Sequence, residues 1–261
     1  MAEIIKIGYE TDNSRSADGG PPIIIENVYK SFGPNVILNG FHLTEHQNEN
    51  VVVLGKSGAG KSVLIKCIIG LMKPDSGRIM VFGDNVPKLN HHELDRARAR
   101  IGFLFQGNAM YDSMTIRENL EFPLRRHWIK MKQAEVDDMV MEALENVNLA
   151  HTVDMMPAEL SGGMLKRVAL ARTMILKPDI ILYDEPTTGL DPVTAREIDA
   201  LIVKLQKKYN TSSIIISHDM NCVKNTADRV VLLLDGKCYT EGTYEELEHS
   251  TDKKINQFFE Y

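Results

Sequence analysis

The sequence predicts an α/β fold in which a mostly parallel sheet is flanked by helices, with an antiparallel β part and an inserted helical subdomain. The first observation behind this prediction is a series of short apolar runs, at residues 23–25, 51–54, 180–183, 214–217 and 230–234. Several of these runs are followed by helical patterns. Strands that are apolar throughout are covered on both faces, which is characteristic of parallel sheets.

The second observation is a different pattern between residues 90 and 160. Six apolar residues of this stretch recur at i, i+3, i+4, i+7, i+8 and i+11, namely Val136, Met139, Val140, Ala143, Leu144 and Val147. This spacing places them on one face of an amphipathic helix. We therefore expect a helical subdomain over about residues 90–160, inserted in an α/β domain that spans residues 23–242.

The two ends of the chain are expected to lie outside this domain. Residues 1–22 end in TDNSRSADGGPP, which has no apolar period and cannot bury much surface. We predict a mobile tail there, after a short strand at residues 3–9. Residues 243–261 are predicted to form a C-terminal extension, whose Phe258 and Phe259 are available to pack on their own domain or on a partner.

Composition excludes several classes of function. Of the 261 residues, 43% are hydrophobic, which is enough for a sizeable core. The formal net charge of −6 gives no global footprint for nucleic acid. The apolar runs are far shorter than the ~20 residues that cross a bilayer, and we expect no signal peptide, so a membrane role requires partner subunits. The three cysteines show no metal or disulfide spacing, which favours a reducing compartment.

The segment GKSGAGKS fits the pattern of a phosphate-binding loop, GxxxxGK[ST]. It follows the apolar run 51–54 and precedes an apolar helix predicted over residues 63–71, and this context disfavours a chance match in an ordinary glycine turn. Its glycines allow a tight turn whose N–H groups point at phosphate oxygens, next to the positive end of a helix dipole. The predicted nucleotide-binding residues of this P-loop are Gly55, Lys56, Ser57, Gly58, Ala59, Gly60, Lys61, Ser62 and Val63.

Within this loop two side chains have distinct predicted roles. Lys61 should reach the β- and γ-phosphates, and the Ser62 hydroxyl should ligate Mg²⁺. The strand, loop and helix together predict a P-loop NTPase core.

A pair of adjacent carboxylates, Asp184 and Glu185, follows the apolar strand 180–183 in the run ILYDEP. Ligands of open α/β sheets collect at this end of the strands. We predict that Asp184 holds Mg²⁺ and that Glu185 polarises the attacking water. By itself such a pair is more often a solvated loop end, but the P-loop upstream favours the catalytic interpretation.

His218 lies at the end of another apolar strand, in the run ISHD. A neutral imidazole there can hydrogen-bond a γ-phosphate and the attacking water. A lone histidine is more often structural, and we predict no role for the other seven.

The run LSGGM at residues 160–164 predicts the start of a helix that extends from about Met164 to Leu176. Ser161, Gly162 and Gly163 would form its N-terminus, which is a second place suited to a phosphate. Because the P-loop already holds the phosphates of its own chain, this second site is most useful to the ATP of another chain.

The order of these motifs resembles that of the nucleotide-binding subunit of ATP-binding cassette (ABC) transporters, over about residues 23–242. The motifs are the P-loop, Gln106 in FLFQ, LSGGM, the Asp184–Glu185 pair, Asp191 in GLDP and His218. The resemblance implies ATP and Mg²⁺ as cofactors. It also implies a head-to-tail dimer with two ATP molecules, each held between the P-loop of one copy and the LSGGM of the other.

The resemblance further implies roles for single residues. Phe32, in YKSFG, would stack on adenine, with Tyr29 a weaker candidate and a core aromatic the alternative interpretation. Asp191 would cross the dimer interface. Ser161 and Gly163 would bind the γ-phosphate of the opposite subunit, and Gly162 is a further implied nucleotide-binding residue. The implied Mg²⁺ ligands are Ser62, Gln106 and Asp184, and the implied catalytic residues are Glu185, His218 and Gln106.

Two departures from the commonest pattern narrow the resemblance. The P-loop continues with Val63 where most members have Thr, and the signature ends in Met164 where most have Gln. Together with FPLRRH at residues 122–127, these variants resemble the ATPase of MCE-associated, Mla-type phospholipid-trafficking transporters. This implies a permease, an MCE-domain protein and a small regulatory subunit as partners, phospholipid as cargo, no nucleic acid, and a place at the cytoplasmic face of the inner (plasma) membrane.

In this family a groove near residues 106–115 receives a short helix of the permease. Met110, Tyr111 and Met114 suit such a socket, although ordinary subdomain core is an equally good interpretation. Three alternative functions stay open at this point. They are an ABC ATPase of another transporter (solute import or lipoprotein release), a force-transmitting cell-division-type ABC protein, and a soluble ABC ATPase that acts on DNA or ribosomes.

Overall fold

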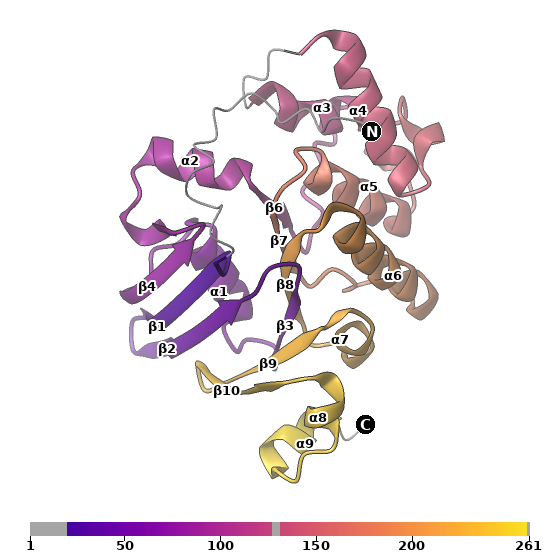
Figure 1. Cartoon of the computed structure of the whole chain (residues 1–261). Helices are drawn as coiled ribbons and strands as arrows, with labels where there is room; N and C mark the ends of the chain where they lie inside the picture. Colours follow the sequence, from indigo (N-terminus) through magenta and orange to yellow (C-terminus); the bar gives the residue numbers. More distant parts are fainter. Residues whose placement is uncertain (1–19, 127–130, 260–261) are drawn as a thin grey trace.

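The structure is a computed structural model that describes residues 20–126 and 131–259 (Figure 1). The predicted mobile tail up to residue 19 and the short strand at residues 3–9 lie outside the described residues, as does His127 at the end of FPLRRH. Two sheets carry the fold, and the predicted α/β fold class, with a parallel sheet, an antiparallel part and helices, is confirmed.

The larger sheet has six strands in the order β10-β9-β3-β8-β7-β6. Five of them run parallel, and only β10 pairs antiparallel with its neighbour β9. Four of the five apolar runs predicted as strands occupy its middle, where every residue of β3, β7 and β8 is buried, whereas the run 23–25 belongs to β1 of the smaller, antiparallel sheet. The strands are β3 (Asn50–Leu54), β6 (Ile101–Leu104), β7 (Ile180–Asp184), β8 (Ser212–Ser217), β9 (Arg229–Leu234) and β10 (Lys237–Gly242).

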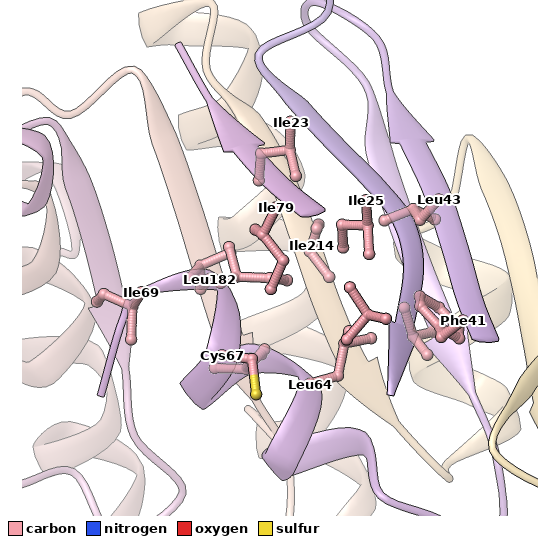
Figure 2. Close-up of a cluster of buried hydrophobic side chains, with 14 of the residues drawn as sticks. Ile23, Ile25, Phe41, Leu43, Leu64, Cys67, Ile69, Ile79, Leu182 and Ile214 are labelled. Carbon is pink, nitrogen blue, oxygen red and sulfur yellow. The ribbon is translucent and has the colours of Figure 1, made fainter. Parts of the chain in front are cut away.

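The smaller sheet has the order β2-β1-β4-β5 and is antiparallel throughout. One of its faces packs against helix α1 and the parallel sheet, and the buried side chains between them form one cluster, part of which is drawn in Figure 2. There Ile25 and Ile79 of the small sheet meet Leu64 of α1 and Ile214 of β8. The strands are β1 (Ile23–Phe32), β2 (Asn35–Glu45), β4 (Ser76–Val81) and β5 (Asp84–Asn85).

Helices cover the other face of the parallel sheet, where α5, α6 and α7 contribute to a second buried cluster. Phe258, at 8% exposure, belongs to that cluster, and Phe259 packs edge-on against Tyr244. Both phenylalanines therefore pack on their own domain here. The helices are α1 (Lys61–Ile68), α2 (His91–Ala99), α3 (Ile116–Arg126), α4 (Gln133–Asn146), α5 (Gly162–Met174), α6 (Pro192–Tyr209), α7 (Met220–Thr226), α8 (Tyr244–Glu248) and α9 (Lys253–Phe259).

A third buried cluster joins α3, α4 and α5 and forms the helical part at the top of Figure 1. The predicted apolar face of α4 points into it, with Val140 and Leu144 fully buried. Within the stretch 90–160, however, residues 101–104 form β6 of the parallel sheet. Among the described residues, no helix is both long and apolar enough to cross a membrane.

Candidate active site

The P-loop connects the end of β3 to the start of α1. Gly58 and Gly60 have φ angles of +79° and +102°, which only glycine adopts without strain. A Cβ on Gly60 would lie 2.6 Å from the Ile37 side chain, so the loop needs glycine there for space as well. No side chain caps α1, and its first turn holds no acidic residue. The N–H groups of that turn are thus available to an anion.

Lys61 places its charge at this loop although its side chain is only 5% exposed. Its ammonium donates to the carbonyl oxygens of Gly55 and Lys56, at 2.7 and 3.1 Å. The same nitrogen lies 3.5 Å from the Glu185 carboxylate. A buried ammonium beside a set of free backbone N–H groups forms a site for a polyanion such as a nucleotide triphosphate.

Ser62 and Asp184 come together across the sheet. The Ser62 hydroxyl donates to the Asp184 carboxylate at 2.9 Å, so the start of α1 meets the end of β7. Burial raises the pKa of Asp184, and the hydrogen bond from Ser62 opposes that shift. One hydroxyl and one carboxylate fit Mg²⁺, which keeps several waters and takes the rest of its ligands from phosphates. Groups of three or more His, Cys, Asp or Glu side chains that could hold a metal by themselves do not occur among the described residues.

Glu185 and His218 form a second pair beside this one. The Glu185 carboxylate lies 2.8 Å from Nδ1 of His218 and accepts from the Thr188 hydroxyl at 3.2 Å. The φ angle of Glu185 is +52°, a left-handed conformation that costs a non-glycine residue roughly 1–3 kcal/mol. This backbone turn separates the two neighbouring carboxylates, so that Asp184 faces Ser62 while Glu185 faces Lys61 and His218.

Gln106 lies at the same edge of the sheet but does not join this cluster. It follows β6, which pairs with β7 through Leu104 and Tyr183. Its side chain is exposed, and its backbone carbonyl accepts a hydrogen bond from Lys166 at 3.0 Å. The structure therefore brings Lys61, Ser62, Asp184, Glu185 and His218 together and leaves Gln106 one strand away.

The two aromatic candidates for adenine differ in their surroundings. Phe32, at the end of β1, is 48% exposed, and the Lys30 ammonium lies 5.5 Å from its ring centroid. Tyr29 is 42% exposed, but its hydroxyl group packs against Gly40 of β2. A Cβ added at Gly40 would lie 3.0 Å from that hydroxyl oxygen. Phe32 thus has the freer ring, and its assignment as the stacking residue stays a prediction.

The LSGGM segment begins helix α5 two residues earlier than predicted, at Gly162. Ser161 caps the helix, because its hydroxyl accepts from the N–H of Met164 at 3.3 Å. A Cβ on Gly163 would lie 2.7 Å from the side chain of Thr194 at the start of α6, whereas a Cβ on Gly162 would meet nothing within 4 Å. Gly163 therefore serves close packing inside the chain, and Ser161 and Gly162 face outward.

Asp191 lies next to this segment and caps α6. Its carboxylate accepts from the N–H groups of Val193 and Thr194 and, at 2.6 Å, from the Thr194 hydroxyl. These hydrogen bonds lower the pKa of Asp191. Since Thr194 also touches Gly163, the two motifs form one exposed surface, and within the described residues no hydrogen bond or ion pair joins that surface to the P-loop.

Two residues beside the site were not predicted from the motifs. Thr188 fixes the Glu185 carboxylate, and Lys166, only 2% exposed, holds the backbone of Gln106. Thr188 could have been found from the hydroxyl three residues after Glu185. Nothing in the sequence around Lys166 distinguishes it from a solvated helix lysine.

Comparison with known proteins gives consistent matches over most of the chain. A family model described as ABC transporter matches residues 38–188. The intermembrane phospholipid transport system ATP-binding protein MlaF of Haemophilus influenzae is 37% identical over 236 residues, which cover 90% of this chain and 89% of that protein. The probable ribonucleotide transport ATP-binding protein mkl of Mycobacterium tuberculosis is 38% identical over 239 residues, or 92% of this chain and 66% of that protein.

Solved structures of ATP-binding cassettes also resemble the fold of this chain. The dimeric ATP-binding cassette MJ0796 in a post-hydrolysis state, bound to ADP and Pi, gives a TM-score of 0.77 at 31% identity and covers 85% of this chain and 98% of its own. CbiO1 of Clostridium perfringens is described as part of the ABC transporter complex cbiONQ. It gives a TM-score of 0.81 at 28% identity, and the match covers 91% of this chain and 95% of CbiO1.

Proposed function

Because this chain belongs to the ABC transporter family, as the ATP-hydrolysing subunit of a transporter, we propose that two copies of it close around ATP and drive a permease that moves phospholipid. The observation that supports the catalytic part most directly is the cluster of Lys61, Ser62, Asp184, Glu185 and His218 at the ends of three neighbouring strands. These side chains lie up to 157 residues apart in the sequence, as the numbers of Lys61 and His218 show.

Each side chain of this cluster has a task that its contacts support. Lys61 and the N–H groups of α1 bind the phosphates, and Ser62 and Asp184 supply oxygen ligands for Mg²⁺, which when bound neutralises charge on the phosphates. Glu185 accepts a proton from the attacking water, while His218 and Thr188 hold its carboxylate in one orientation. Gln106 would have to move from its exposed place beside β6 to reach the metal.

The second copy is proposed because the LSGGM surface is exposed and, among the described residues, no hydrogen bond or ion pair joins it to the P-loop of its own chain. Ser161 and Gly162 are exposed at a helix N-terminus, and Asp191 lies beside them. A head-to-tail dimer would place this surface over the P-loop of the other copy. The two-fold symmetry then forms two equivalent sites, each from the P-loop of one copy and the LSGGM surface of the other. The match to a dimeric cassette with ADP and Pi supports this arrangement.

The permease contact is proposed for the segment around Gln106, over residues 105–115. Phe105 and Tyr111 are 38% and 42% exposed, and the Tyr111 ring lies 4.8 Å from that of Phe122. Buried Asn119 fixes the loop through hydrogen bonds to the backbone of Tyr111, Met114 and Thr115. An exposed aromatic surface on a fixed loop suits a short amphipathic helix of a membrane subunit.

Phospholipid is the proposed cargo, on the similarity to MlaF together with Val63 and Met164. The remaining proposed partners are an MCE-domain protein and a small regulatory subunit, with the chain held at the cytoplasmic face of the inner membrane by its permease. The similarity to mkl, which is named for ribonucleotide transport, supports a second candidate cargo.

One experiment separates the two cargoes. The native complex is purified in detergent through a tag on this chain, and its proteins and lipids are identified by mass spectrometry. We expect a permease, an MCE-domain protein and phospholipid. A complex without phospholipid, whose ATPase activity rises with added ribonucleotides, would contradict the lipid assignment and leave the ATPase assignment intact.

A further inference from the structure

The loop that carries Gln106 has a backbone shape that its own residues do not favour. Asn108 and Ala109 have φ angles of +60° and +52°, and two consecutive left-handed residues without glycine are rare. The N–H of Ala109 closes a tight turn onto the carbonyl of Gly107 at 2.6 Å. A loop of this shape needs contacts from outside to stay in one conformation.

Two cations of helix α5 provide those contacts. The Lys166 ammonium donates to the Gln106 carbonyl at 3.0 Å, and the Arg172 guanidinium donates to the Asn108 carbonyl at 3.0 Å. Lys166 is 2% exposed and Arg172 is half-buried. A buried ammonium is stable only while it is hydrogen-bonded, so the Lys166 bond is costly to break without a replacement.

The same helix begins with the surface proposed to meet the ATP of the other copy. Ser161 caps α5, Lys166 is five residues further on, and Arg172 follows within the same uninterrupted helix. A helix moves as a rigid body, so a shift of its first turn also shifts both cations. Helix α5 and its two cations thus connect the surface proposed to meet the ATP of the other copy with the Gln106 loop beside the P-loop of the same chain.

We propose that Lys166 and Arg172 are positioning residues that make the Gln106 loop follow helix α5, so that closure on one ATP sets Gln106 at the other. The inference rests on the proposed two-site dimer. The effect of the two cations is on where Gln106 stands when the surface at Ser161 to Gly163 is engaged.

The test is Lys166→Met in the full-length chain, measured by ATPase kinetics and by ATP affinity. We expect kcat to fall about tenfold or more, since misplacement of a catalytic group by about 1 Å can cost about a hundredfold. The Hill coefficient for ATP should fall toward unity, whereas the affinity for ATP without hydrolysis should not change, because the P-loop is intact. Lys166→Arg, which keeps a buried donor, should restore most of kcat.

The matched control is Lys177→Met. Lys177 follows the end of α5 and pairs with Glu142 on the protein surface, so its loss should leave all three quantities unchanged. Hydrogen exchange of a peptide over residues 103–112 supplies a readout besides activity, and should speed up in Lys166→Met and in Arg172→Gln.

Three outcomes are informative. If the wild type hydrolyses ATP and both variants keep its kcat and Hill coefficient, the inference is wrong and the proposed function stands. If Lys166→Met lowers ATP affinity and speeds exchange over the whole domain, the role of Lys166 is only stability and the inference is wrong for Lys166. Unchanged kcat and an unchanged Hill coefficient in Arg172→Gln would then overturn it for Arg172 as well. If the wild type has no ATPase activity, the proposed function itself fails.

Discussion

The P-loop cluster (Lys61, Ser62, Asp184, Glu185 and His218) and the LSGGM surface (Ser161, Gly162 and Asp191) both lie at a helix N-terminus. The side chains of the first have their partners within the chain, whereas the second is left exposed. In the P-loop cluster, Lys61, Asp184 and Glu185 are each less than 10% exposed, and each has a charged or hydrogen-bonding partner. At the LSGGM surface, Ser161 and Gly162 are exposed, and the Ser161 hydroxyl only caps its own helix.

The difference shows which half of the site the fold prepares in advance. The P-loop cluster stands at the ends of β3, β7 and β8, and the buried strands hold its residues in register. The LSGGM surface rests on the packing of α5 against α6, where Gly163 allows contact with Thr194. A pre-organised cluster can bind, but an exposed half-site becomes useful only when a second molecule covers it.

The largest effect on ATP turnover is expected from a substitution in the P-loop cluster. Glu185→Gln removes the carboxylate that His218 and Thr188 orient, and should lower turnover by about a hundredfold or more, as for loss of a general base. ATP binding should persist, because the P-loop is untouched. A closed dimer should accumulate with ATP and be visible by light scattering, whereas wild-type turnover in this variant would contradict the assignment of the base.

A smaller effect, which tests directly whether the two halves of a site come from different chains, is expected from mixing two inactive variants. Lys61→Ala disables the P-loop, and Gly162→Asp adds a negative charge to the LSGGM surface at a position where a Cβ meets nothing in its own chain. Each variant alone should be inactive. In a head-to-tail dimer of one of each, both defects fall in the same site and the other site is intact, so a one-to-one mixture should regain up to about a quarter of wild-type activity.

The control for this mixture is each variant combined with more of itself, at the same total concentration. Activity that does not return on mixing, while gel filtration shows mixed dimers, would mean that the P-loop and LSGGM of one chain act together.

The smallest effect is expected far from both halves, at Glu45 near the end of β2. Glu45 is fully buried, neither of its carboxylate oxygens has a hydrogen-bond partner, and burial together with nearby Glu49 raises its pKa well above 4.5, against the pull of Arg229. The folded state therefore holds a proton that the unfolded chain releases, and stability should fall as pH rises from 4.5 toward the folded-state pKa.

Glu45→Gln should remove this dependence. Chemical unfolding is measured from pH 4.5 to 8. The free energy of unfolding of the variant minus that of the wild type should increase as pH rises and then become constant, with a total change of about 1–3 kcal/mol. A difference that does not change with pH would show that Glu45 carries no extra proton. ATPase activity at neutral pH should be unaffected, because Glu45 lies at neither half of the site.

Much of the site was predictable because its motifs are local. The P-loop needs glycines, a lysine and a hydroxyl at fixed spacing, and Asp184 and His218 follow apolar strands, so their meeting at one sheet edge follows from parallel pairing. The helix boundary at LSGGM was two residues off, since Ser161 itself caps the helix. The span 90–160 contains β6, which is too short to stand out from its neighbours by pattern.

The sequence by itself determined the fold class, the family and the residue types of both halves, because each depends on spacing along the chain. Only the tertiary structure decided that Glu185 meets His218, that Gly163 at the start of α5 packs on Thr194 of α6, and that Lys166 reaches the carbonyl of Gln106. These contacts join residues 31 to 60 positions apart, and burial and packing rather than local pattern select them.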